Sequence, residues 1–259
     1  MNILLTNDDG FEAEGLNCLR EVLTSYSHNV WVVAPLKNKS GASSSITMYT
    51  KLVFEKKEEN VFALDGTPVD CVIAAIKGDF LPCKPDVVFS GINRDGNLGT
   101  DIVYSGTCAA SRQASLYGIP GIALSSESKG ESRGREKVFK YKALSEFAAE
   151  NLELLIELCG EKKSVMPFYV NVNAPSEDSF SGVKFTSPCT RMYGDKVEIT
   201  KENGVTYSNC MGGTEILSLG DGNDDNAVVS KKMISITALK TEPAWDNSSF
   251  LDKQGLFKL

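Results

Sequence analysis

The chain has 259 residues, with 27 Lys and Arg against 34 Asp and Glu, so its formal net charge at pH 7 is −7. This acidic balance argues against a protein dedicated to binding a nucleic-acid duplex, which usually carries a basic surface. The chain contains one histidine, His28. That scarcity excludes histidine-rich zinc sites, and any Ser-His-Asp or Cys-His catalytic arrangement would have to use this one residue.

The seven cysteines are odd in number, and none of them forms a Cys-x-x-Cys pair. This usage is typical of free thiols in a reducing compartment. The first residues lack the basic region and long apolar run of a signal peptide, and no stretch approaches the roughly 18 apolar residues of a membrane span. We therefore expect a cytoplasmic protein without a membrane partner.

Over its first two-thirds the chain alternates short apolar runs with segments of helical periodicity. The expected strands are residues 3–5, 30–33, 86–89, 121–124 and 168–172, and the expected helices cover residues 16–23, 108–117 and 144–159. Short continuous apolar strands that alternate with helices indicate a parallel sheet covered on both faces. The sequence therefore predicts an α/β, Rossmann-like fold with a mostly parallel sheet.

Two regions depart from this alternation. Residues 46–64 alternate apolar and polar side chains around a charged centre, which predicts a β-hairpin projecting from the sheet. After about Gly182 the pattern becomes strand-like and irregular. We expect an α/β body over residues 1–181 and a smaller β-rich C-terminal appendage over residues 182–259.

Polar side chains follow several of the expected strands, at the edge where an open parallel sheet binds ligands. They occur in Asn7-Asp8-Asp9-Gly10, residues 40–45, Ser90-Gly91-Ile92-Asn93 and residues 171–173. Hard divalent cations such as Mg²⁺, Mn²⁺ or Ca²⁺ prefer carboxylate, carbonyl and water oxygens. The edge is therefore suited to such a cation, although a polar turn that caps the next helix would also account for the acid pair.

A second polar element surrounds Asn97 and the segment Ser105-Gly106-Thr107, which opens a helix of small residues. Hydroxyls and free backbone N–H groups at a helix start can cradle a phosphate. The lysine of a Walker A motif is absent, and a plain helix N-cap is the alternative interpretation. A cation beside an anion cradle indicates phosphate-ester hydrolysis, whereas His28 is expected at the surface of the opposite, amino-terminal edge.

Taken together, these motifs resemble the SurE (survival protein E) nucleotidase family. The stretches that carry the resemblance are residues 2–10, 34–35, 40–43, 66–71, 85–93, 96–99, 104–107, 171–173 and 235–237. The resemblance implies a metal-dependent phosphatase that hydrolyses nucleoside 5′- and 3′-monophosphates. It implies metal ligands at Asp8, Asp9, Ser40 and Asn93, and substrate contacts at Asn97, Ser105, Gly106 and Thr107. Asp8, Asp9 and Asn97 are then the expected catalytic residues.

The same resemblance implies one divalent ion, Mg²⁺ or Mn²⁺, with Ca²⁺ as a further candidate in a crystal. It also implies a cytoplasmic homodimer or homotetramer, with the C-terminal appendage taking part in oligomerisation. The chain departs from the family near its end, because Lys240 stands where the family commonly has a histidine, and Ala238 where it has a proline. This departure leaves the general acid open.

Two other hypotheses remain at this stage. Asp8 follows the first expected strand, where an aspartyl nucleophile of a phosphatase could sit and form a phospho-enzyme. Alternatively, one fold can host a nucleotide-binding or metal-sensing module that has no turnover.

Overall fold

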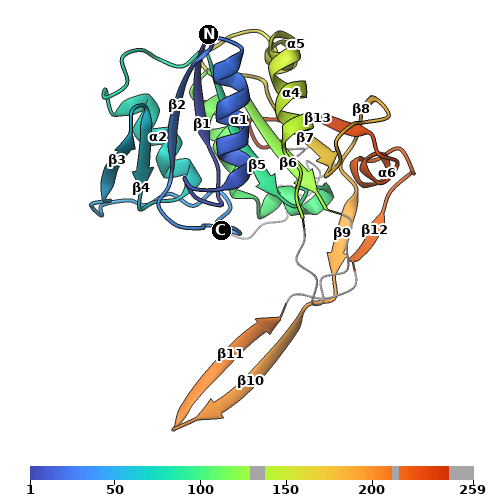
Figure 1. Ribbon diagram of the computed structural model, residues 1–259. Helices are drawn as coiled ribbons and strands as arrows, with labels where there is room; N and C mark the ends of the chain where they lie inside the picture. Colours follow the sequence, from blue (N-terminus) through green and yellow to red (C-terminus); the bar gives the residue numbers. More distant parts are fainter. Residues whose placement is uncertain (129–137, 212–215, 245–259) are drawn as a thin grey trace, which may run out of the picture.

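The structure, a computed structural model, describes residues 1–128, 138–211 and 216–244 and is built on a nine-stranded sheet flanked by helices (Figure 1). The strands of this sheet are β1 (Asn2–Thr6), β2 (Asn29–Pro35), β3 (Phe54–Glu58), β4 (Val61–Leu64), β5 (Val87–Arg94), β6 (Gly121–Glu127), β7 (Phe168–Pro175), β8 (Val183–Phe185) and β13 (Ile234–Lys240). The helices are α1 (Glu14–Ser25), α2 (Pro68–Lys77), η1 (Gly99–Val103, a 3₁₀ turn), α3 (Gly106–Leu116), α4 (Lys142–Glu150), α5 (Leu152–Glu157) and α6 (Asp225–Ser230).

The strand order is β3-β4-β2-β1-β5-β6-β7-β13-β8. Every pairing from β4 through β7 is parallel, whereas β3 and β13 run antiparallel to β4 and β7. The parallel part places the carboxyl ends of β1, β2, β5, β6 and β7 at one edge of the sheet. The predicted α/β, Rossmann-like fold with a mostly parallel sheet is therefore confirmed.

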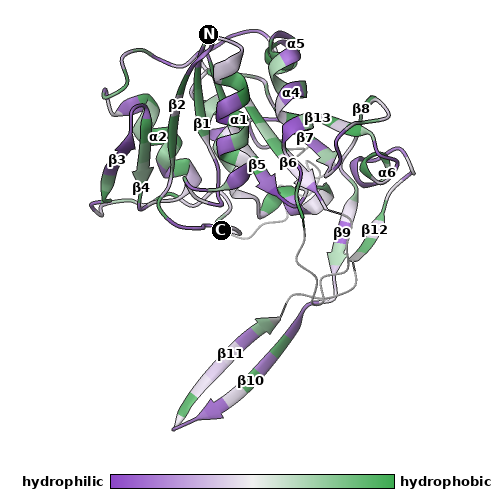
Figure 2. Ribbon diagram, viewed as in Figure 1, coloured by the Kyte–Doolittle hydropathy of each residue, from purple (hydrophilic) through white to green (hydrophobic). Residues whose placement is uncertain are grey.

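Successive residues of the central strands face opposite layers of helices, which explains their continuous apolar runs. Ile3 and Leu5 of β1 pack into the core under α1, α4 and α5, and Leu4 between them packs under α2 and α3. Figure 2 shows β1 and β2 coloured mostly as hydrophobic. Among the described helices, none is long and apolar enough to cross a membrane.

The helix expected over residues 144–159 is instead two helices, α4 and α5, separated at Asn151. The Asn151 side chain donates a hydrogen bond to the Phe147 carbonyl oxygen at 2.9 Å, and its own backbone N–H donates to the same oxygen. The side chain thus shares the Phe147 oxygen with the helical N–H, and such a bond to the preceding turn distorts a helix locally.

The hairpin predicted over residues 46–64 exists as β3 and β4, but it does not project from the sheet. Strand β4 pairs in parallel with β2, so the hairpin extends the large sheet at its edge. Its apolar side chains explain this placement, because Val61 and Leu64 are buried and Phe62 stacks against Phe54. Burial of these groups against the sheet is more favourable than exposure on a free hairpin.

The region after residue 182 is β-rich, as expected, but its first and last strands belong to the large sheet. Strand β13 lies between β7 and β8, with Ile234 and Ile236 in the main core. The expected boundary at residues 181 and 182 therefore does not separate two sheets. Residues 212–215 and 245–259 of the expected appendage lie outside the described residues.

Two further ribbons complete this region. Strands β9 (Thr190–Tyr193) and β12 (Ile216–Leu219) form one antiparallel pair, and β10 (Lys196–Glu202) and β11 (Val205–Met211) form the other. The second pair, called the arm (residues 196–211) below, projects far from the body in Figure 1. The projecting hairpin of this fold is thus the arm and not residues 46–64.

Candidate active site

The loop after β1 holds the acid pair in a fixed turn. The Asn7 side chain donates to the Gly10 carbonyl oxygen at 2.8 Å and accepts from the Gly10 N–H at 3.2 Å. Gly10 has φ +108°, a backbone conformation that favours glycine. Asp8 and Asp9 are therefore presented by a preformed loop at the carboxyl edge of the sheet.

Asp8 is buried against the start of α3. The Thr107 hydroxyl donates a hydrogen bond to Asp8 Oδ1 at 2.6 Å. A Cβ added at Gly106 would lie 2.9 Å from Asp8 Cβ, so only glycine permits this approach. Burial raises the pKa of Asp8 above its ordinary value, against the opposing effect of hydrogen bonds from Thr107 and Gly106.

Asp9 lies on the outer side of the same loop. Its carboxylate accepts hydrogen bonds from the Arg94 N–H at 3.2 Å and from the Asn38 amide at 3.4 Å. Burial, and then repulsion from Asp8, raise the pKa of Asp9 to about 6. A cation bound by both carboxylates would relieve this repulsion.

A pocket of about 310 Å³ opens beside the acid pair and is lined by residues from separate loops. Five of the residues predicted from the sequence line it, namely Asp8, Ser40, Asn93, Asn97 and Ser105. Asp9 instead lines a neighbouring cavity with Arg94, and Gly106 and Thr107 are buried in the first turn of α3. All the predicted residues therefore lie at one edge of the sheet. Five of them line the pocket, and the other three lie next to it.

The donor atoms on one side of this pocket fit a hard divalent cation. Asp8 and Asp9 supply carboxylates, and Ser40 supplies a hydroxyl. The Asn93 amide nitrogen donates to the Asp95 carbonyl oxygen at 2.7 Å, which leaves the side-chain oxygen Oδ1 as the ligand atom. These oxygens are the ligand types that Mg²⁺ and Mn²⁺ prefer.

The other side of the pocket fits an anion. The Ser105 side chain accepts a hydrogen bond from the Cys108 N–H at 3.0 Å and so caps α3. The N–H groups of Gly106 and Thr107 are directed at the Asp8 carboxylate. The first turn carries the positive partial charge of the helix. A phosphate placed here would lie next to this positive charge and the Ser105 hydroxyl, beside the oxygen-ligand side of the pocket.

Asn97 is fixed in place by two neighbouring strands. Its backbone N–H donates to Asn173 Oδ1 at 2.8 Å, and its carbonyl oxygen accepts from the Asn171 side chain at 2.9 Å. Its own amide nitrogen donates one hydrogen to Ser125 at 2.8 Å and retains a second for a ligand. The asparagines of β7 were identified in the sequence without a role, and the structure gives them this positioning role.

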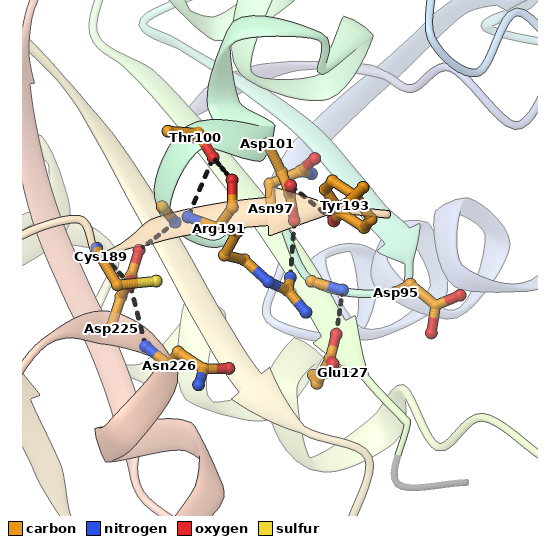
Figure 3. A network of polar contacts seen from close by, with 12 residues as sticks. Asp95, Asn97, Thr100, Asp101, Glu127, Cys189, Arg191, Tyr193, Asp225 and Asn226 are labelled. Atoms are coloured by element: carbon orange, nitrogen blue, oxygen red, sulfur yellow. Dashed lines mark hydrogen bonds and ion pairs between the residues drawn. The ribbon is translucent and has the colours of Figure 1, made fainter. Parts of the chain in front are cut away.

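Six residues that the sequence interpretation did not assign to the site also line the pocket, namely Gly41, Arg94, Gly96, Asp101, Tyr104 and Tyr193. Arg94 follows Asn93 directly, so its position was a usable signal. Tyr193 lies in β9, and Figure 3 shows that it reaches the site through a hydrogen bond to Asp101. Nothing in the sequence pattern connects these two positions.

A separate group of potential metal ligands lies nearby, where Cys189, Asp224 and Asp225 place their ligand atoms within 4.8 Å of one another. The Asp225 carboxylate already accepts from the backbone N–H groups of Cys189 and Gly99, and Asp224 caps α6 through the Ala227 N–H. Burial raises the pKa of the Cys189 thiol to about 11, which disfavours the thiolate that a metal requires. This group therefore ties segments together and does not offer a free ligand set.

Lys240 and His28 both lie away from the pocket. Lys240 is exposed and pairs with Phe168, the first residue of β7, so it lies at the opposite edge of the sheet. His28 lies at that amino-terminal edge too, 3.3 Å from the Met1 amino group. The replacement of the family's histidine at position 240 consequently leaves this chain's own pocket unchanged.

The fold and site define a class of protein, namely Rossmann-like α/β proteins that combine an oxygen-ligand pocket with a helix N-terminus at the carboxyl edge of the sheet. Comparison with known proteins identifies the family. The family model described as Survival protein SurE matches residues 3–195, and the chain belongs to the SurE family.

Relatives match most of the chain. A protein named 5′-nucleotidase SurE from Geotalea daltonii is 38% identical over 244 residues, which cover 92% of each chain. Another of that name from Rhodospirillum rubrum is 38% identical over 200 residues, covering 76% of this chain and 73% of its own. The crystal structure of the SurE protein from Aquifex aeolicus superposes with a TM-score of 0.77 at 29% identity, over 99% of both chains.

Proposed function

We propose that this chain is a divalent-metal-dependent phosphatase that hydrolyses nucleoside 5′- and 3′-monophosphates to nucleoside and phosphate. The observation that carries the proposal is the contact between Thr107 and Asp8. This contact places the start of α3, which suits a phosphate, against a carboxylate that suits a metal ion. Relatives named 5′-nucleotidase support the choice of substrate class.

In this proposal Asp8, Asp9, Ser40 and Asn93 hold one Mg²⁺ or Mn²⁺ ion. The bound ion supplies positive charge to the phosphoryl group and lowers the pKa of water. The Ser105 hydroxyl and the second amide hydrogen of Asn97 bind the phosphate oxygens, and the positive end of α3 at Gly106 and Thr107 lies beside them. Asp8 or Asp9 orients the attacking water and accepts its proton, which requires no histidine.

The proposal is tested by measuring phosphate release from AMP, GMP and their 3′ isomers with Mg²⁺, Mn²⁺ or Ca²⁺ and after chelation with EDTA. We expect release that depends on the added metal, and a loss worth several kcal/mol of transition-state stabilisation in Asp8→Asn. Activity that survives complete chelation would sink the metal mechanism. Trapping of a phospho-aspartate by rapid quenching would instead favour an aspartyl nucleophile, and tight AMP binding without turnover would favour a binding module.

We also propose that the chain forms a homodimer or homotetramer through the arm. Among the residues that the structure describes, strands β10 and β11 pair only with each other, and an isolated two-stranded hairpin is marginally stable in water. One face of the arm carries exposed Val197, Ile199 and Cys210. Contact with a second copy would stabilise this ribbon, so removal of the arm should reduce the mass measured by light scattering.

A cytoplasmic location completes the proposal. Support comes from the seven cysteines, all of which are free and four of which are buried as ordinary core thiols. Fractionation of the source cells, with activity followed in the soluble and membrane fractions, tests the assignment.

A further inference from the structure

The lining of the pocket changes from buried polar side chains at its floor to exposed aromatic side chains at its mouth. Asn97 and Ser105, on the proposed phosphate side, are only 7% and 6% exposed. Tyr104 and Tyr193 line the same pocket but are 66% and 39% exposed. A ligand with a phosphate at the buried polar end would therefore extend its remaining part along aromatic rings.

Tyr193 is held in a defined orientation although its ring is partly exposed. Its hydroxyl donates to Asp101 Oδ1 at 2.6 Å, and Arg191 Nη1 donates to Asp101 Oδ2 at 2.6 Å (Figure 3). The side chains of Arg191 and Asp101 are only 8% and 14% exposed, so this ion pair is well shielded from water. Burial and the bond to Asp101 raise the pKa of Tyr193, which keeps its hydroxyl protonated as a donor.

The strand that carries Tyr193 is also fixed to the segment that carries the phosphate site. The Thr100 hydroxyl donates to the Arg191 carbonyl oxygen at 2.6 Å and accepts from the Arg191 N–H at 3.1 Å. Asp225 accepts hydrogen bonds from both Gly99 and Cys189, one on each segment. The distance from the Tyr193 ring to Asn97 is therefore set by a rigid connection and not by a mobile loop.

We infer that Tyr193, together with Tyr104 on the same rim, forms the surface against which the nucleobase of the substrate stacks. This inference rests on the proposed function and defines its substrate class as nucleoside monophosphates in preference to simple sugar phosphates. Stacking on an aromatic ring is open to every base, because each base has a π face. The pocket should therefore distinguish a substrate that has a base from one that lacks it. It should distinguish much less between one base and another.

The test compares AMP with ribose 5-phosphate, which carries the same phosphate and sugar without the base. Tyr193→Ala should lower kcat/KM for AMP about tenfold and leave kcat/KM for ribose 5-phosphate within about twofold. Tyr193→Phe keeps the ring and loses only the bond to Asp101, so its preference for AMP should fall less than about threefold. Tyr207→Ala, which removes an exposed tyrosine from the arm, is the matched control and should change neither value.

Equal losses on both substrates in Tyr193→Ala would overturn the inference, because they would indicate a structural role alone. A wild-type protein without preference for AMP would overturn it as well. If the wild type releases phosphate from neither substrate, the proposed function fails separately. Equilibrium dialysis of AMP and ribose 5-phosphate then makes the same comparison without turnover, and an AMP affinity unchanged in Tyr193→Ala would refute the stacking surface.

Discussion

The hydroxyl of Thr107 donates a 2.6 Å hydrogen bond to the carboxylate of Asp8, from a position 99 residues further along the chain. Both residues are buried, at 0% and 4% exposure. The bond joins the first turn of α3 to the loop after β1, so the proposed phosphate and metal sites share one fixed boundary. Substitutions at the start of α3 should therefore affect Asp8 and Asp9.

Replacement of Thr107 tests this connection. Thr107→Val keeps the shape of the side chain and removes the donor, which leaves Asp8 Oδ1 buried without that partner. A lost partner for a buried polar group costs about 1–3 kcal/mol of unfolding free energy. Thr107→Ser keeps the donor and is the control. Urea unfolding of both variants should show the larger loss in Thr107→Val, and equal losses would contradict a role for the hydroxyl.

Gly106→Ala tests the close approach of α3 to the acid pair. Helix propensity alone predicts that alanine stabilises α3 by up to about 1 kcal/mol. The added Cβ, however, would meet Asp8 Cβ at 2.9 Å and Pro68 Cγ at 3.0 Å, so α3 would have to shift away. We expect lower activity and lower stability in Gly106→Ala. Gln113→Ala, also in α3, is the control for propensity, and a gain of stability in Gly106→Ala would refute the steric argument.

Metal binding should be visible as a rise in Tm. In metal-free protein the buried Asp8 and the half-buried Asp9 repel each other. A bound cation stabilises the folded state by about 2.7 kcal/mol at a hundredfold excess over Kd. Mg²⁺ or Mn²⁺ should therefore raise Tm, and EDTA should reverse the rise. Asp8→Asn should abolish the shift and Cys189→Ser should retain it. The opposite pattern would place the ion at the group of Cys189, Asp224 and Asp225.

Much of the body follows from local sequence patterns. Residues such as Ile3 to Leu5 form an apolar run that suits a strand buried on both faces, and the acid pair beyond it lies at the ligand-binding edge, as predicted. The contacts of Asp101 with Arg191 and Tyr193 join residues about 90 positions apart and depend on how β9 packs on η1. The insertion of β13 between β7 and β8 is equally non-local. Periodicity reports which face is buried, but not which distant segment buries it.

Thiol reactivity should separate the core cysteines from the exposed ones. Burial raises the pKa of Cys108 to about 12 and that of Cys189 to about 11. At pH 8.5 an ordinary thiol is about half ionised, whereas a thiol with either of these raised pKa values is ionised in fewer than about one molecule in a hundred. Iodoacetamide should therefore label exposed Cys83 quickly and leave Cys108 and Cys189 unlabelled until the protein is unfolded, as peptide mapping by mass spectrometry would show. Rapid labelling of Cys108 in folded protein would contradict its burial.

Cys210 should report whether the arm contacts a second copy. It is exposed within one chain and lies directly opposite Val197, on the face that also carries Ile199. In an oligomer formed through this face, Cys210 should react at least about tenfold more slowly than Cys83. Ile199→Lys should restore its reactivity and reduce the mass measured by light scattering, since a buried unpaired charge opposes association. Asn209→Lys adds the same charge to the opposite face of the arm and should change neither measurement. Equal effects of the two substitutions would show that the face with Ile199 is not the contact.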